Sequence, residues 1–200
     1  MTKITRKKSN ELSELHTNLK LLYYDLRQKK KKEWDRVLPF DELLFDRSEK
    51  SDYVKAKNGT SVYENSYWYG KVIVGKNTWV GPFTVLDGSG GTLKIGNSCT
   101  LSSGVQIYTH NVVERTLTGG KAPIKKKNVT IEDCCFLGPY VLVPLGVRIG
   151  KCSVIGAHSF VNSDIPPYSI AYGIPAKIVG KVKIVNGKVE YNLFKKTKKK

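Results

Sequence analysis

The chain has 200 residues and a mass of 22.4 kDa, which suits one domain with a modest appendage. Hydrophobic residues make up 40% of it, which excludes global disorder, and no apolar run reaches the roughly 18 residues of a membrane-spanning helix. The formal net charge of +17 predicts an anionic partner, such as a nucleic acid, a membrane surface or a phosphorylated small molecule.

The N-terminal region is predicted to be helical. Ser9, with Glu11 in the first turn, marks the expected start, and Asp41–Phe45 adds a short second helix. The long helix is expected to dock against the rest of the fold or a neighbouring subunit rather than form a free trimeric coil. The opening MTKITRKKSN is basic but no apolar segment follows it, so we expect no secretory signal and a cytoplasmic location. The helix carries one apolar stripe with a 3-4-3-4 spacing, made of Leu12, Leu15, Leu19, Leu22 and Leu26.

The central part of the chain carries a six-residue repeat. Aliphatic residues recur at every sixth position, often followed by glycine, with small or β-branched residues two places earlier. The same register runs upstream from Val74 to Leu86 and from Ile95 to Ile107, and Asp87–Gly91 reads as a loop inserted between these runs. Downstream, the repeat positions are Ile131, Leu137, Val143, Ile149, Ile155 and Val161.

A period of six fits neither an amphipathic helix nor an ordinary meander. It fits a solenoid of triangular coils, with three short strands per coil and the aliphatic residues stacked inside. Residues 131–148 and 149–166 then form consecutive coils, with glycine helping the tight turns. The predicted fold is all-β: a left-handed parallel β-helix of hexapeptide repeats with an N-terminal α-helical segment and a C-terminal β-hairpin.

The C-terminal region predicts a hairpin. Residues 183–191 are strand-like and turn at Asn186–Gly187, the preferred type I′ pair, so the hairpin is expected to cap the last coil or pack outside it. We therefore divide the chain into an N-terminal helical segment (1–65), a β-helix domain (66–180) with an excursion at 108–128, and a hairpin with a basic tail (181–200).

Residues 70–180 resemble the hexapeptide-repeat acetyltransferases, in particular the sugar O-acetyltransferases and the streptogramin-type xenobiotic acetyltransferases. The D-I-P-P motif and the G-I-P-A-K motif that follows it are the most specific points of likeness. The resemblance implies homotrimers, acetyl-CoA as the acyl donor, and active sites in clefts between subunits. It rests on the segments Ile131–Gly138, Pro144–Lys151, Val154–Ala157, Asp164–Tyr168 and Gly173–Lys177.

His110 is the candidate catalytic residue. It lies where the excursion interrupts the repeat, and such an excursion from a solenoid is usually functional or disordered. Imidazole titrates near working pH, and the resemblance implies that a histidine here is the general base for a hydroxyl acceptor. Glu114 or a backbone carbonyl is expected to orient it. His16 and His158 are interpreted as structural or solvent-facing, with a contact role kept open for His158 beside the cofactor groove.

A cysteine nucleophile is the alternative, but Cys99 and Cys135 occupy small inward positions where a thiol reacts poorly. The cysteine spacing also predicts no metal site. We therefore expect direct acetyl transfer in a ternary complex.

The donor site is inferred from the resemblance. Its pantetheine arm is expected to lie along the groove between adjacent solenoids, with lysines near the CoA phosphates. Pro139 departs from the family pattern because it has no N–H to serve as an oxyanion donor, which leaves the oxyanion hole unassigned. The expected CoA-binding residues are Phe136, Gly138, Ala157, Asn162, Lys177 and Lys181.

The acceptor site is expected near Asp87, Tyr108 and Asn111, although Asp87 can equally be a turn residue that binds its own backbone. The leading prediction is an acetyl-CoA-dependent sugar O-acetyltransferase of surface-polysaccharide biosynthesis. The alternatives are N-acetylation of a nucleotide-linked amino sugar and O-acetylation of a streptogramin-type antibiotic. A nucleic-acid binder or a β-helix scaffold is disfavoured because the charge gathers at the termini and in one loop. A peripheral contact with the inner face of the membrane is kept open.

Overall fold

The computed structural model describes residues 3–194, so the terminal lysine run from residue 195 lies outside the described residues. The chain divides into two compact units, residues 1–46 and 47–200. Within the described residues, no helix is long and apolar enough to cross a membrane.

The first unit holds the long helix α1 (Lys3–Trp34) and the short helix α2 (Asp41–Leu44). Phe40 packs edge-on against Tyr23 of α1, with the ring centroids 5.3 Å apart. The second helix was predicted correctly, whereas the predicted start of the first at Ser9 is wrong. The six residues before Ser9 contain no glycine or proline to stop the helix, which extends back to Lys3.

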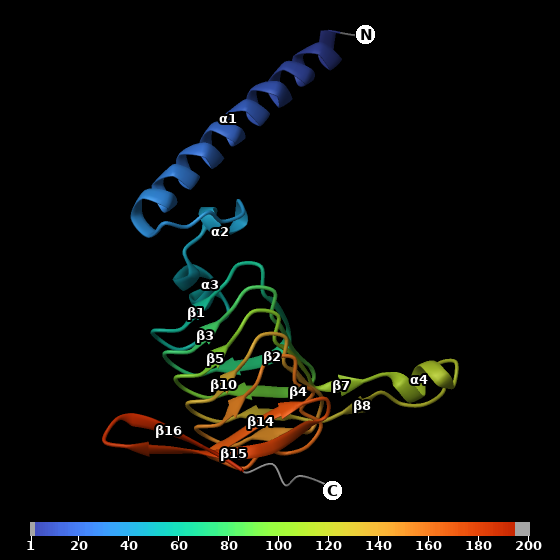
Figure 1. Cartoon of the computed structure of the whole chain (residues 1–200). Coiled ribbons are helices and arrows are strands. Elements are labelled where there is room, and N and C mark those ends of the chain that lie inside the picture. The colour runs from blue at the N-terminus through green and yellow to red at the C-terminus, as the bar shows by residue number, and fades with distance from the viewer. Residues whose placement is uncertain (1–2, 195–200) are drawn as a thin grey trace, which may run out of the picture. The chain divides into compact units, whose positions relative to one another are not determined.

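The second unit begins with α3 (Arg47–Tyr53) and continues as a parallel β-helix (Figure 1). Its first face is a stack of parallel strands, one from each coil. The strands of this face are β1 (Ser61–Val62), β3 (Trp79–Val80), β5 (Thr100–Leu101), β10 (Phe136–Leu137), β13 (Val154–Ile155) and β14 (Ser169–Gly173).

The second and third faces are joined, because two long strands bend from one face to the other. These are β2 (Tyr67–Val74) and β4 (Val85–Ile95), which stay paired on both sides of the bend. The second face is continued by β6 (Gln106–Tyr108) and β11 (Leu142–Val143). The third face is continued by β9 (Val129–Ile131) and β12 (Arg148–Ile149).

The core is a column of the repeat's aliphatic side chains. All six downstream repeat positions, from Ile131 to Val161, are fully buried, so the predicted register is confirmed. The glycines that follow them serve close packing of coils rather than left-handed turns. A Cβ on Gly138 would lie 2.7 Å from the backbone nitrogen of Ala157. The left-handed dihedrals fall instead on turn residues such as Cys134 and Cys152.

Two details of the predicted coils are wrong. Asp87–Gly91 is not a loop but the middle of β4, because Gly88 packs directly against the backbone of Lys71 on the coil before. The last coil is two residues shorter than predicted, since Ile149 pairs with Ile165.

The excursion is an ordered arm. Tyr108 is still paired with Asp87 in the β-helix, and the arm proper starts with β7 (His110–Asn111). It continues through α4 (Val113–Leu117) and returns as β8 (Lys125–Lys126), which is antiparallel to β7.

The C-terminal hairpin is confirmed. It consists of β15 (Ala176–Val185) and β16 (Lys188–Leu193), joined by Asn186 and Gly187, both with positive φ. β15 pairs antiparallel with β14, so the hairpin extends the first face beyond the last parallel coil. The predicted all-β hexapeptide-repeat fold, with its helical N-terminal segment, is therefore confirmed.

Candidate active site

His110 lies beside a buried carboxylate at the corner between the second and third faces, which we call the histidine corner (Thr109–His110 with Asp87–Gly90). The Nδ1 atom of His110 lies 3.0 Å from Oδ2 of Asp87. The Asp87 side chain is 6% exposed and that of His110 is 30% exposed, so the carboxylate is enclosed while the imidazole remains accessible. The two residues come from neighbouring coils, brought together by the pairing of β4 with β6.

The Asp87 carboxylate is held by its own strand. Its Oδ1 accepts hydrogen bonds from the Ser89 amide at 2.8 Å and the Ser89 hydroxyl at 2.6 Å. The buried Thr109 hydroxyl donates to the Asp87 carbonyl at 2.8 Å and accepts from the Gly90 amide at 3.0 Å. Asp87 therefore both binds the backbone of its own strand and contacts His110, two roles that had been treated as alternatives in the sequence analysis.

This geometry suits an imidazole base. If Nδ1 carries the proton of the neutral imidazole, its N–H donates a hydrogen bond to the Asp87 carboxylate. This hydrogen bond fixes the tautomer and leaves Nε2 with a free lone pair. Ser89 Oγ lies 3.3 Å from the same Nδ1 and adds a second contact on that side. Glu114, which was expected to orient the imidazole, instead forms an ion pair with Lys125 in the arm.

The expected acceptor residues surround this pair. Tyr69, Asp87 and Tyr108 are direct neighbours on three adjacent strands. Burial raises the pKa of the Tyr108 phenol, with smaller contributions from Asp87 and Tyr69, so the phenol stays protonated and donates to Gln106 Oε1 at 2.9 Å. Asn111 follows His110 on β7, where its Oδ1 accepts from the Val113 amide at 2.7 Å. Its Nδ2 group remains available to donate a hydrogen bond to an acceptor substrate.

The expected donor residues form a separate group. Phe136, Gly138 and Ala157 lie on or beside the first face, at its corner with the second face, which we call the glycine corner (Phe136–Tyr140 with Ala157–His158). Phe136 is 43% exposed and can offer an apolar wall. In one chain, the histidine corner and the glycine corner are therefore different edges of the triangular coil.

The remaining expected donor residues lie further toward the C-terminus. Asn162 is exposed at the same edge as His110, two coils further along the solenoid. Lys177 and Lys181 project from β15, where Lys181 Nζ also contacts the Ser169 hydroxyl at 3.3 Å. His158 is stacked on Tyr140 with ring centroids 5.1 Å apart, and its amide donates to the Pro139 carbonyl.

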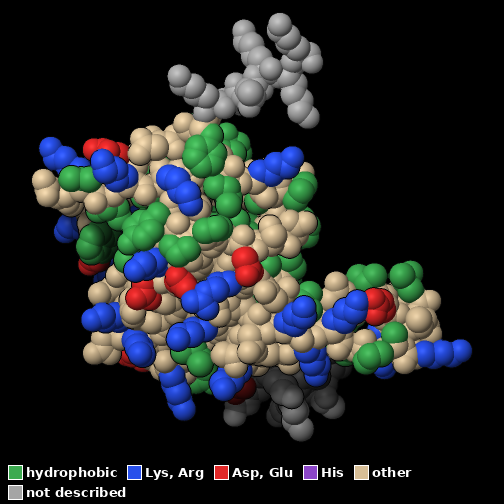
Figure 2. Space-filling model, turned by 90° about the horizontal axis from the view of Figure 1, so that it is seen from below, with side chains coloured by type: hydrophobic (Ala, Val, Ile, Leu, Met, Phe, Trp, Pro, Cys, Tyr) green, Lys and Arg blue, Asp and Glu red, His purple; other side chains and the backbone are tan. Residues whose placement is uncertain are grey.

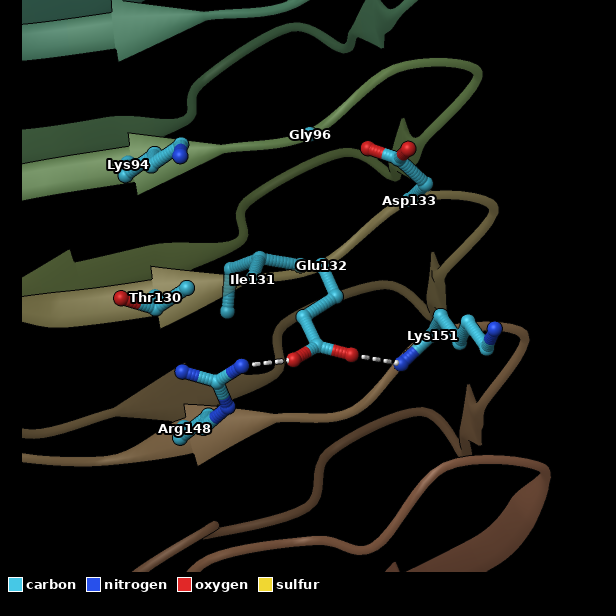
Figure 3. Close-up of a pocket in the computed structure, with 8 residues that line it drawn as sticks. All are labelled: Lys94, Gly96, Thr130, Ile131, Glu132, Asp133, Arg148 and Lys151. Atoms are coloured by element: carbon cyan, nitrogen blue, oxygen red, sulfur yellow. Dashed lines mark hydrogen bonds and ion pairs between the residues drawn. The ribbon is translucent and has the colours of Figure 1, made fainter.

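A polar pocket of about 360 Å³ lies on the third face, away from the histidine corner (Figure 3). Glu132 lies at its centre, where it forms an ion pair with the Arg148 side chain and accepts a hydrogen bond from the Lys151 backbone amide. The pocket contains none of the predicted site residues. It is lined by Lys94, Gly96, Thr130, Ile131, Glu132, Asp133, Arg148 and Lys151.

Comparison with known proteins identifies similar sequences and structures among acetyltransferases. No family model matches the chain. A probable acetyltransferase of Mycobacterium tuberculosis (Rv3034c) is 33% identical over 64% of this chain and 41% of its own length. The galactoside O-acetyltransferase of Escherichia coli is 30% identical over 54% of this chain and 63% of its own length. Over these matched segments the chain is similar to acetyltransferases.

Solved structures of hexapeptide-repeat and related acyltransferases share the fold of this chain. A hexapeptide-repeat acetyltransferase from Vibrio cholerae (VCA0836), complexed with acetyl-CoA, superposes with a TM-score of 0.58 at 23% identity, covering 86% of this chain and 90% of that one. The N-acyltransferase AntD of Bacillus cereus, in complex with dTDP and 3-hydroxybutyryl-CoA, gives 0.56 at 16% identity, covering 68% and 87%. The chain spans less than two thirds of the length of the two curated relatives described above.

The sequence analysis missed two contributions to the histidine corner. They are the Ser89 hydrogen bonds to the Asp87 carboxylate and the Thr109 hydroxyl that links the Asp87 carbonyl with the Gly90 amide. Both follow from the register. Leu86 and Ile107 are equivalent repeat positions, so residues just after each lie side by side on neighbouring coils. Extending that equivalence by one residue pairs Asp87 with Tyr108 and points to the contact with His110.

Proposed function

We propose that the protein is an acetyl-CoA-dependent O-acetyltransferase that acts on a sugar hydroxyl, with His110 as the general base. The observation that carries the proposal is the contact between His110 Nδ1 and the buried Asp87 carboxylate. A hydroxyl is a poor nucleophile until a base removes its proton, and an oriented imidazole is the side chain best matched to that task near neutral pH. The Escherichia coli relative is a galactoside O-acetyltransferase, which supports a sugar acceptor.

The residues of the glycine corner fit the pantetheine arm of CoA. The Ala157 amide has no intramolecular acceptor in the described part of the chain, so it is free to bind an amide or carbonyl group of that arm. Phe136 supplies apolar surface beside it, and Lys177 and Lys181 supply exposed positive charge for phosphates. The Gly138 amide is already bonded to the Ile155 carbonyl, and Pro139 has none, so Ala157 is also the best-placed backbone donor for a developing oxyanion.

In the proposed mechanism, acetyl-CoA supplies the acetyl group as a thioester when it is bound. His110 Nε2 accepts the proton of the acceptor hydroxyl as that oxygen attacks. Asp87 holds the imidazole orientation and stabilises the positive charge that forms on it. The imidazolium then returns the proton to the leaving sulfur, so no protein group is consumed.

The proposal includes a homotrimer. Because the histidine and glycine corners are different edges of one solenoid, a neighbouring copy has to bring its glycine corner to the histidine of the first. A site between subunits would unite the two groups. We also propose the cytosol as compartment, where acetyl-CoA is available, and glycan biosynthesis as the pathway.

Nucleic-acid binding receives no support from the surface in Figure 2. Lysine and arginine side chains there are dispersed among apolar and acidic ones rather than gathered into one continuous face.

The test is release of free CoA thiol from acetyl-CoA against a panel of sugars, nucleotide-linked sugars, amino sugars and streptogramins. We expect turnover with a hydroxyl acceptor and a loss of about 10²- to 10⁴-fold in kcat for His110→Ala. His16→Ala, a histidine on α1, is the matched control and should retain full turnover. Preferred turnover of an amino sugar with little dependence on His110 would favour the N-acetyltransferase, because a free amine needs less help from a base. Full activity of His110→Ala on every acceptor would refute the mechanism.

A further inference from the structure

The leucine stripe of α1 is an unpartnered surface in the first unit. Figure 1 shows α1 as one uninterrupted helix, and it runs for 32 residues. Leu12, Leu15, Leu19 and Leu22 are 63%, 53%, 43% and 42% exposed. The segment that folds back after α1 covers a different position, since Phe40 and the Leu38 carbonyl contact Tyr23. Within the described residues of this unit, the stripe is therefore largely uncovered from Leu12 to Leu22, and half-buried at Leu26.

We infer that this stripe, defined as Leu12, Leu15, Leu19, Leu22 and Leu26, pairs in parallel with the same stripe of another copy of this chain. The 3-4-3-4 spacing is that of the a and d positions of a heptad repeat, with Leu12, Leu19 and Leu26 at a and Leu15 and Leu22 at d. A repeat of 3.5 residues keeps the seam facing a partner helix. This inference is independent of the proposed enzymatic function.

Charges beside the seam match a second copy. In a parallel coiled coil, the g position of one helix faces the e position of the next heptad on its partner. Asp25, which also forms an ion pair with Lys29 of its own helix at 2.8 Å, is at g and Lys30 is at the following e, so the two copies place opposite charges together. Glu11 and His16 occupy the corresponding g and e positions near the other end, where an imidazole N–H can donate to the carboxylate. A parallel arrangement also stacks each of the five leucines on its own equivalent, whereas an antiparallel one opposes a to d positions and leaves one leucine unmatched.

The leucine at position 21 offers a matched control. Leu21 is 63% exposed and next to Leu22, but it falls at c, on the outer side of the proposed pair. Cysteine at Leu22 would face its own equivalent in a parallel pair, and cysteine at Leu21 would not. Cys134 is a free, exposed thiol, so all variants carry Cys134→Ser; Ser98 already occupies the equivalent turn position with the same left-handed φ.

The test is disulfide crosslinking of the full chain under a mild thiol oxidant, followed by non-reducing electrophoresis. We expect Leu22→Cys to form crosslinked chains at least about tenfold faster than Leu21→Cys, as a d-position contact requires. Adding Leu15→Lys to the Leu22→Cys protein should abolish the crosslink, because a charge then enters the seam. Leu19→Cys, at an a position, should crosslink like Leu22→Cys.

Several outcomes would overturn the inference. Equal rates for Leu21→Cys and Leu22→Cys would mean random collisions. Crosslinking only when Leu12→Cys and Leu22→Cys are combined would mean an antiparallel pair. Absence of crosslinks, together with cosedimentation of the protein with phosphatidylserine vesicles that Leu22→Lys abolishes, would assign the stripe to a lipid surface.

Discussion

The Nδ1 atom of His110 and the Oδ2 atom of Asp87 lie 3.0 Å apart although the two residues belong to different coils of the solenoid. The contact exists because β4 and β6 pair in parallel, with Asp87 opposite Tyr108. The spacing of paired strands sets the distance between the two backbones, whatever side chains they carry. The pair is therefore built on strands rather than on the mobile end of a loop, which is the arrangement that holds a catalytic group most accurately.

Replacement of Asp87 tests the orienting role. Asp87→Asn keeps an oxygen that can accept from Nδ1–H, but it removes the negative charge that stabilises an imidazolium. We expect kcat to fall by about 10²-fold or more, with an unchanged KM for acetyl-CoA. Steady-state thiol-release kinetics measure both quantities. A fall in CoA affinity with normal kcat would instead place Asp87 in the donor site.

Gly90 tests how closely the strand approaches the histidine. A Cβ at this position would lie 2.5 Å from the Cβ of His110, so Gly90→Ala has to displace the imidazole or the backbone. We expect loss of most turnover and a destabilisation of about 1–3 kcal/mol in urea unfolding. Ser89→Ala removes a hydroxyl near Nδ1 without adding an atom, so its effect on turnover should be much smaller. Equal activity of Gly90→Ala and the wild type would show that the histidine position is unimportant.

The core column predicts a large difference between two isoleucines. Ile131 is fully buried among coils, whereas Ile174 is 77% exposed. Ile131→Ala is expected to destabilise the fold by about 2–5 kcal/mol, and Ile174→Ala by less than about 0.5 kcal/mol. Thermal unfolding followed by circular dichroism compares them. Similar melting temperatures for the two variants would contradict the assigned register.

Asp133 makes stability depend on pH. Its Oδ1 accepts from the Asn97 amide at 2.8 Å and from the Asn97 side chain at 3.2 Å, and the backbone contact is the larger cause of a lowered carboxyl pKa. A group whose pKa is lower in the folded state stabilises the protein above its unfolded pKa of about 4 and loses that contribution as pH falls through the folded value.

The corresponding variant is Asp133→Asn. Because the site is exposed, we expect a loss of no more than about 1 kcal/mol at pH 7. Melting temperatures of the two proteins should converge as the pH is lowered from about 4 toward 2. A constant difference across that range would mean that the charge of Asp133 is not involved.

The repeat register could be predicted from the sequence because a single aliphatic residue marks each inward-facing position. Ile131, Leu137 and Val143 stand six apart, and only a short-stranded coil buries all of them. The hairpin was equally local, since Asn186–Gly187 supplies the dihedrals of its turn.

Features that depend on contacts between coils were harder to predict. The glycines of Asp87–Gly91 suggested a loop. Gly88 and Gly90 are instead strand positions where neighbouring coils approach so closely that a side chain would not fit. His110 was identified by its place in the sequence and by the resemblance to the acetyltransferases. Its partner Asp87 was missed because Glu114 is nearer in sequence, whereas Asp87 is nearer in space. The start of α1 was misplaced because a serine was treated as a cap where the helix continues through it.

The reversal of chain direction at the C-terminal hairpin also affects how molecules meet end to end. A solenoid that finished on a bare parallel coil would offer a template onto which the first coil of another molecule could add, and such a head-to-tail contact does not close on itself. Here β15 runs antiparallel to β14, and β16 follows as a strand whose side chains are all exposed. On the first face, the end of the stack therefore no longer matches its beginning, so a strand of another molecule meets an antiparallel edge there instead of a parallel one.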